Sequence, residues 1–81
     1  MNKYIEELSC GDAFFVDNEY YILTRDFKKN GSKLAIGLKD GISRWFESDK
    51  MVENSQLYIM DKDNNIIPIK PTAKQDVSIE T

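Results

Sequence analysis

Residues 20–46 read YYILTRDFKKNGSKLAIGLKDGISRWF and contain the two turns on which our fold prediction depends. Asn30-Gly31 and Asp40-Gly41 each separate runs that are rich in aromatic and β-branched residues. Both dipeptides favour two-residue hairpin loops, because their residues tolerate the positive φ that a type I′ turn requires. The stretch is therefore expected to form three antiparallel strands joined by two tight hairpins.

A two-residue loop at Asn30-Gly31 also predicts which side chains face the core, because neighbours in a strand point to opposite faces. It sets Leu23 opposite Leu38, and the second loop sets Trp45 on the same face. The predicted core face holds Tyr21, Leu23, Phe27, Leu34, Ile36, Leu38 and Trp45. Arg25 falls on this face as well. It must reach past the edge, pair with a carboxylate, or mark a β-bulge that re-aims Arg25 or Phe27.

The rest of the chain continues the pattern of short apolar runs bounded by turn residues. The predicted strands are residues 13–17, 20–27, 33–38, 42–47, 56–60 and 66–69. Residues 3–9 are expected to form a short helical turn and residues 48–52 a short helical link. Pro68 assigns the last run to an edge, because proline cannot donate to a ladder. Periodicity ends at Pro71, so residues 71–81 are expected to be a loose tail.

These elements predict an all-β fold: a small antiparallel SH3-like barrel of five to six strands. A strongly twisted sheet with one apolar face must curl to cover that face, and closure into a small barrel does so with few residues. With 81 residues there is room for one core only, so residues 1–70 are expected to form a single domain.

Composition argues against enzymatic and metal-dependent functions. The chain contains no histidine and one cysteine, Cys10, so the commonest proton shuttle and metal ligand are missing and no intramolecular disulfide is possible. The sequence has no phosphate-binding glycine motif, and residues 61–72 lack the glycine and glutamate of a calcium loop. We expect no catalysis and no cofactor. Without a signal peptide or an apolar run of membrane-spanning length, we expect no membrane contact and a location in the cytoplasm.

The opposite sheet face is our first candidate for a binding site. Three aromatic doublets, Phe14-Phe15, Tyr20-Tyr21 and Trp45-Phe46, must each send one ring away from the core. Aromatic and arginine side chains dominate protein interfaces. The predicted protein-binding residues are Tyr20, Ile22, Arg44 and Phe46. Cover by the N-terminal segment or the tail is an equally weighted alternative, and self-association is a further possibility.

A second candidate site is basic. Residues 25–50 carry seven of the eleven cations, whereas the ends of the chain are acidic and the net charge is −3. Arg25, Lys28, Lys29 and Lys33 gather at the Asn30-Gly31 hairpin, as in small barrels that bind single-stranded nucleic acid. Lysines at a hairpin tip also keep an edge soluble, and Asp26 and Asp40 interrupt the patch, so this interpretation is the less favoured one.

Three stretches carry a resemblance: Gly11-Asp12-Ala13-Phe14-Phe15, Tyr20-Tyr21-Ile22-Leu23, and residues 34–46 with their LAIGLKDG and WF motifs. Over residues 8–60 the chain resembles small, mostly uncharacterised β-barrel proteins encoded by bacteriophages. The resemblance implies a non-enzymatic accessory protein that engages a host macromolecule, such as a host protein whose defence or enzymatic role it inhibits. It carries no catalytic motif and transfers no functional residue.

Overall fold

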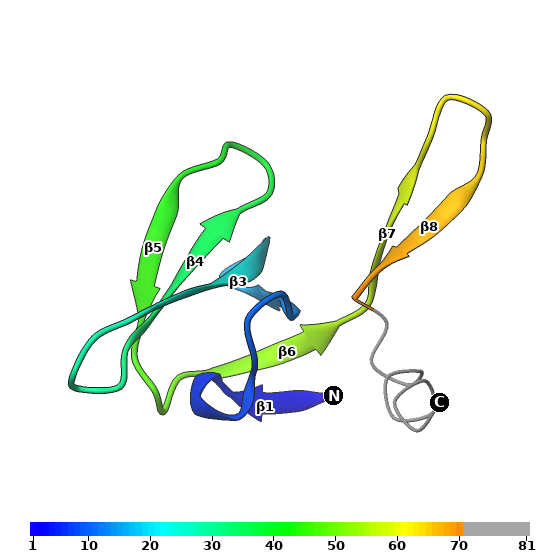
Figure 1. Cartoon of the computed structure of the whole chain (residues 1–81). Helices are drawn as coiled ribbons and strands as arrows, with labels where there is room; N and C mark the ends of the chain where they lie inside the picture. Colours follow the sequence, from blue (N-terminus) through cyan, green and yellow to red (C-terminus); the bar gives the residue numbers. More distant parts are fainter. Residues whose placement is uncertain (71–81) are drawn as a thin grey trace, which may run out of the picture.

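The computed structural model describes residues 1–70, and the predicted tail, residues 71–81, lies outside the described part. The structure is all-β, with antiparallel pairing throughout and one short 3₁₀ turn (Figure 1). The elements are β1 (Asn2–Tyr4), η1 (Ile5–Glu7), β2 (Ala13–Val16), β3 (Glu19–Phe27), β4 (Lys33–Gly37), β5 (Ser43–Phe46), β6 (Met51–Ser55), β7 (Leu57–Met60) and β8 (Ile66–Ile69).

Six strands form one sheet in the order β1-β6-β2-β3-β4-β5, and β7 and β8 form a separate two-stranded ribbon. The four strands from β2 to β5 are a meander, and β6 returns to lie beside β2. Within the described residues no ladder joins β5 to β1, so the closed barrel that we predicted is not confirmed. The helical turn predicted over residues 3–9 is confirmed only as the short 3₁₀ turn η1, because Lys3 and Tyr4 belong to β1. The N–H groups of Ile5 and Glu6 donate to the carbonyls of Lys50 and Ser48, each at 3.0 Å.

Both glycine turns are present, but they are longer than two residues. The N–H of Gly31 donates to the carbonyl of Lys28 (2.9 Å), and the N–H of Lys28 donates to that of Ser32 (2.8 Å). Gly31 has φ of 94°, whereas Asn30 does not have positive φ. This is the three-residue loop in which a type I turn precedes a left-handed residue, so the type I′ prediction is wrong. The second loop is also longer than predicted. The N–H of Gly37 donates to the carbonyl of Ile42, so residues 38–41 form the loop.

The longer first loop and a bulge between Leu23 and Phe27 change the register. Leu23 lies opposite Ala35 instead of Leu38. Because side chains alternate, the odd shift sends Leu34 and Ile36 to the face opposite the core. Our core prediction is therefore right for Tyr21 and Leu23 and wrong for the other five members: Leu34 and Ile36 are half-buried, while Leu38, Trp45 and Phe27 are exposed, Phe27 to 73%. The bulge is one of the three explanations that we left open for Arg25, which is exposed.

The core is a small cluster around three aromatic rings. Its members are Ile5, Leu8, Phe14, Tyr21, Leu23, Ala35, Phe46 and Val52. The Phe14 ring stacks on Tyr21 at 5.6 Å between centroids, and the Phe46 ring meets both rings edge-on, at 5.4 Å from Phe14 and 5.0 Å from Tyr21. Burying three rings gives a short chain much of the apolar area available to it.

Our prediction missed two strands of the sheet, β1 and β6, and placed a helical link over residues 48–52. Instead Met51–Ser55 is a strand that pairs with β1 on one side and β2 on the other. One residue, Gln56, separates β6 from β7, and β7 then continues out of the sheet to pair with β8. In Figure 1 the ribbon and the β4–β5 hairpin project in the same direction, the ribbon at the right of the view and the hairpin at the left.

Candidate functional site

The four residues of the predicted protein-binding face do not lie together. Tyr20 and Ile22 lie on the outer face of the sheet, where Tyr20 is 46% exposed and its ring contacts Phe15 at 4.7 Å between centroids. Phe46 is only 5% exposed and belongs to the core, so its assignment to the outer face is wrong. The register explains the error, because Phe46 lies opposite Lys33 and shares the face of Ala35.

Arg44 is exposed, but it lies on the core face of the sheet, at the edge of the aromatic cluster, and not on the outer face beside Tyr20. It pairs with Ala35, and its guanidinium lies over the rings of Tyr21 and Phe46 at 5.6 and 5.4 Å. The guanidinium donates a hydrogen bond to the Tyr21 hydroxyl, and it lies 3.9 Å from the Asp17 carboxylate. Arg44 therefore covers the end of the aromatic cluster, a structural role that its exposure alone does not reveal.

The four predicted nucleic-acid-binding residues do not form one continuous stripe. Lys33 is half-buried, and its Nζ donates to the carbonyl of Leu8 at 2.8 Å. Its charge therefore points to the core face of the sheet and away from the hairpin surface. Lys28 places its Nζ 4.5 Å from the centroid of the Trp45 ring, where it covers the face on which a base would stack. Arg25 and Lys29 are exposed at the hairpin.

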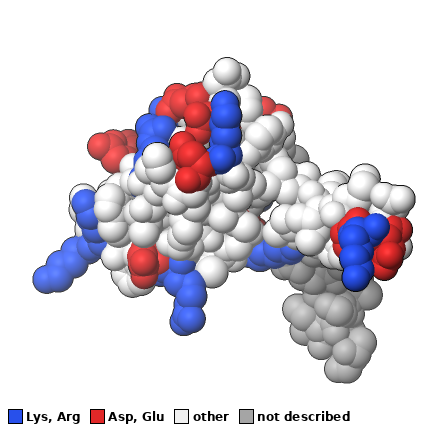
Figure 2. Space-filling model, turned by 90° about the horizontal axis from the view of Figure 1, so that it is seen from above, with Lys and Arg blue, Asp and Glu red and all other residues white. Residues whose placement is uncertain are grey.

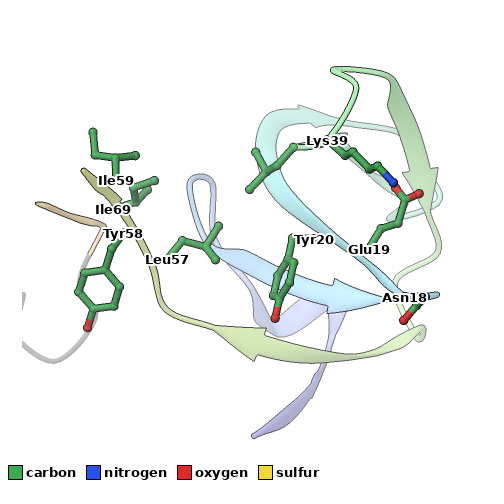
Figure 3. A pocket seen from close by; sticks show the side chains of 9 residues that line it. Asn18, Glu19, Tyr20, Lys39, Leu57, Tyr58, Ile59 and Ile69 are labelled. Carbon is green, nitrogen blue, oxygen red and sulfur yellow. The ribbon is translucent and has the colours of Figure 1, made fainter. Parts of the chain in front are cut away.

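A cleft that sequence reasoning missed lies between the sheet and the ribbon. It has a volume of about 550 Å³. Its lining residues come from the start of β3, the end of β4 and the ribbon: Asn18, Glu19, Tyr20, Leu38, Lys39, Leu57, Tyr58, Ile59 and Ile69. Figure 3 shows Tyr20 and Leu57 on facing sides of the cleft, and the charged residues Glu19 and Lys39 also line it. The walls are thus apolar and the rim is polar.

The pairing of the ribbon decides which of its side chains share a face; three of its four cleft-lining residues share one face, and Tyr58 lies on the other. Leu57 pairs with Ile69 and Ile59 with Ile67, so these four share one face; Tyr58, Met60, Ile66 and Pro68 share the other. Neither strand contains a charged residue. The charges of the ribbon gather at its tip, as Figure 2 shows. A sequence signal was present: two runs without charge on either face, joined by a polar turn, describe a hairpin that leaves at least one apolar face uncovered.

The base of the ribbon is held by polar contacts to the turn before β2. Lys70 donates to the carbonyl of Cys10 (2.7 Å), and its Nζ forms an ion pair with Asp12 (2.9 Å). Gln56 donates to the carbonyl of Ile69 (2.9 Å) at the same level. These contacts fix the position of the ribbon relative to the sheet, and therefore the width of the cleft.

The tip of the ribbon depends on one carboxylate, and acid is expected to loosen it. Asp61 accepts hydrogen bonds from the N–H of Asn65 (2.9 Å), the side-chain amide of Asn65 (3.0 Å) and the N–H of Asp63 (2.8 Å). The backbone N–H of Asn65 is the main cause that lowers the pKa of Asp61 below its ordinary value.

Because this pKa is lower in the folded state than in the unfolded state, the stabilisation is complete above the unfolded pKa, about 4, and is lost as the pH falls through the folded pKa. The amide resonance of Asn65 should move with this titration in NMR spectra, and Asp61→Asn should abolish the movement. An Asn65 resonance that still titrates in Asp61→Asn would contradict this assignment.

Comparison of the chain with protein-family models, with curated proteins and with solved structures finds no match. Within residues 1–70, no helix combines the length and the apolar character needed to cross a bilayer.

Proposed function

We propose that the chain is a non-catalytic protein-binding module that takes apolar side chains of its partner into the cleft between β3 and the ribbon. The observation that carries this proposal is the cleft itself, whose volume of about 550 Å³ falls within the range of ordinary ligand sites. In keeping with the resemblance noted above, we propose an SH3-like accessory protein of phage origin that acts on a host protein in the cytoplasm.

The surface chemistry favours a protein over a nucleic acid as the partner. Tyr20 and Ile59, which both line the cleft, are 46% and 51% exposed, and an exposed apolar site with a polar rim is the usual anatomy of a protein interface. The cleft rim carries one anionic and one cationic side chain, Glu19 and Lys39, and so offers no excess of positive charge to phosphates. The basic hairpin contributes little to the alternative, because Lys33 and Lys28 are engaged elsewhere.

The test compares two charge insertions on opposite faces of the ribbon. Affinity capture from the native host followed by mass spectrometry identifies the partner, and calorimetric titration then measures its Kd. Ile59→Asp buries a carboxylate in the bound cleft and should weaken binding by at least about tenfold, which is about 1.4 kcal/mol. Ile66→Asp, at an equally exposed position on the other face, should bind as the native chain does.

Equal binding by the native chain and Ile59→Asp would reject the cleft as the docking site. Binding that falls steeply with salt and is lost in a Lys28→Ala, Lys29→Ala double variant would instead assign the function to the basic hairpin.

A further inference from the structure

The two edges of the ribbon differ in whether they can accept another strand. The N–H of Asp61 donates to the carbonyl of Asn65 (3.0 Å), which makes this a hydrogen-bonded pair. Such pairs alternate along an antiparallel ladder, so Ile59 and Leu57 bond to β8, while Tyr58 and Met60 direct their backbone groups to the outer edge of β7. Pro68, opposite Tyr58, occupies the outer edge of β8 and has no N–H to offer there.

Within residues 1–70, the outer edge of β7 has none of the usual protection. Edges are normally guarded by proline, by charge, by a bulge or by a covering segment. Leu57–Met60 contains no proline or charge, pairs with β8 without a bulge, and has no strand of the described residues on its outer side. By comparison, the outer edge of β5 carries Arg44 and that of β1 carries Lys3.

This edge also continues a ladder that already exists. β1 pairs with β6, and the N–H of Asn54 donates to the carbonyl of Met1 at 2.8 Å. Successive residues of a strand direct their backbone groups to alternate sides, and in β6 the groups of Asn54 point to β1. Continued through Gln56, this alternation places the outer edge of β7 on the β1 side of the chain and β8 on the β2 side. The contact of Lys70 with Cys10, just before β2, agrees with this placement. A strand added to β7 would therefore extend the line of β1 along the β6–β7 strand.

We infer that this edge pairs antiparallel with β7 of a second copy of the chain, which gives a four-stranded ribbon in the order β8-β7-β7-β8 around a two-fold axis. A strand that adds here must be apolar on both faces, because both faces of the ribbon are apolar. Among the described strands β2, β7 and β8 meet this condition. Both edges of β2 are already paired, with β3 and β6, and Pro68 excludes the outer edge of β8.

Charge sets the direction of the pairing. The charged residues of the ribbon are confined to its tip, where Asp61 and Asp63 outnumber Lys62. Antiparallel pairing places the two tips at opposite ends of the new ribbon, whereas parallel pairing would set like charges side by side. No charged side chain lies between Leu57 and Met60, so the contact itself involves no repulsion although each copy carries a net charge of −3.

Only one register pairs both outward-facing residues of each copy with outward-facing residues inside Leu57–Met60 of the other. Tyr58 of each copy lies opposite Met60 of the other, with both residues exchanging N–H and carbonyl groups, and Ile59 lies opposite Ile59 at the two-fold axis. A contact of this length buries much less than the roughly 1,600 Å² of a standard interface, so the dimer is weak and depends on concentration. Two strands alone are marginally stable in water, and the two added strands support both ribbons.

Sedimentation velocity over about 10 µM to 1 mM tests the edge with a matched pair of variants. Met60→Pro removes an N–H from the outer edge of β7, and Ile66→Pro, its cross-strand partner, removes one from the outer edge of β8. The native chain and Ile66→Pro should dimerise with rising concentration, and Met60→Pro should weaken dimerisation by about tenfold or more. A native chain that stays monomeric at the highest concentration, or equal effects of the two prolines, would overturn the inference.

Cross-linking tests the register on an otherwise unchanged ribbon. Cys10 is exposed and is first replaced by serine. Ile59→Cys should then form a disulfide-linked dimer under mild oxidation. The two copies of residue 59 form a non-hydrogen-bonded pair, and such a pair brings the two Cα atoms to about 4.5 Å. Ile67→Cys, on the same face but on β8, should remain monomeric. A cross-link that favours Ile67→Cys would overturn the inference.

The dimer and the cleft can fail separately. Met60→Pro changes no residue that lines the cleft, so a monomeric Met60→Pro that still binds the host partner leaves the proposed function intact.

Discussion

Replacement of Phe46 by alanine is expected to unfold the domain. The Phe46 ring is 5% exposed and touches both Phe14 and Tyr21, and it supports the guanidinium of Arg44. Removal of a buried phenylalanine costs about 3–5 kcal/mol, and the core of a domain this small supplies a total of about the same size. Thermal or denaturant unfolding followed by circular dichroism should show little folded protein at room temperature.

Its neighbour in the sequence provides the control. Trp45 is 44% exposed on the opposite face of β5, where its ring lies under Lys28. Trp45→Ala is expected to lower the free energy of unfolding by about 1 kcal/mol or less, because no core cavity forms. A Phe46→Ala protein that keeps its midpoint while Trp45→Ala loses it would show that the two side chains are assigned to the wrong faces.

The aromatic doublets show how far the sequence carries a prediction. Alternation requires that one ring of each doublet leave the core, and this holds: Phe14, Tyr21 and Phe46 are buried, whereas Tyr20 and Trp45 are exposed. Alternation does not say which ring of a pair turns inward. That choice depends on the register, and the register depends on the number of residues in each turn.

For the first turn we predicted the wrong number of loop residues. Asn30-Gly31 predicts a two-residue loop, but a three-residue loop with Gly31 alone at positive φ satisfies the same residues. The bulge before Phe27 adds a further offset. When the register shifts by an odd number of residues, each strand stays where it was predicted, but the side chains assigned to the core face lie on the outer face and the reverse. The strands β2 to β5 could thus be predicted from the sequence, while half of the proposed binding face was assigned to the wrong side.

Strand β6 and the cleft depend on contacts between distant segments. Glu53, Asn54 and Ser55 have low strand propensity, and they are held in β6 by pairing with β1 and β2 on its two sides. The cleft combines Tyr20, Leu38 and the ribbon, which no local pattern connects. The ribbon itself was predictable: the polar loop, both strands and the edge position of Pro68 are confirmed.

Phe14→Ala is expected to have an effect as large as that of Phe46→Ala. Phe14 is fully buried, stacks on Tyr21 with an angle of 17° between the rings, and receives the edge of Phe46. The loss of about 3–5 kcal/mol should again leave the chain mostly unfolded in circular dichroism. Phe15→Ala is the matched control, because Phe15 points to the outer face and contacts Tyr20. Equal losses in the two variants would contradict the assignment of faces in β2.

Milder substitutions can then measure the contact between the two rings in folded protein. Phe14→Leu and Phe46→Leu, alone and together, form a double-mutant cycle over a pair whose centroids are 5.4 Å apart at an angle of 87°. An edge-to-face pair contributes about 0.5–1.5 kcal/mol beyond the area that it buries, so the double variant should lose less stability than the sum of the single losses. Strictly additive losses in urea unfolding would mean that each ring stabilises the core through burial alone and that the geometry of the pair contributes nothing.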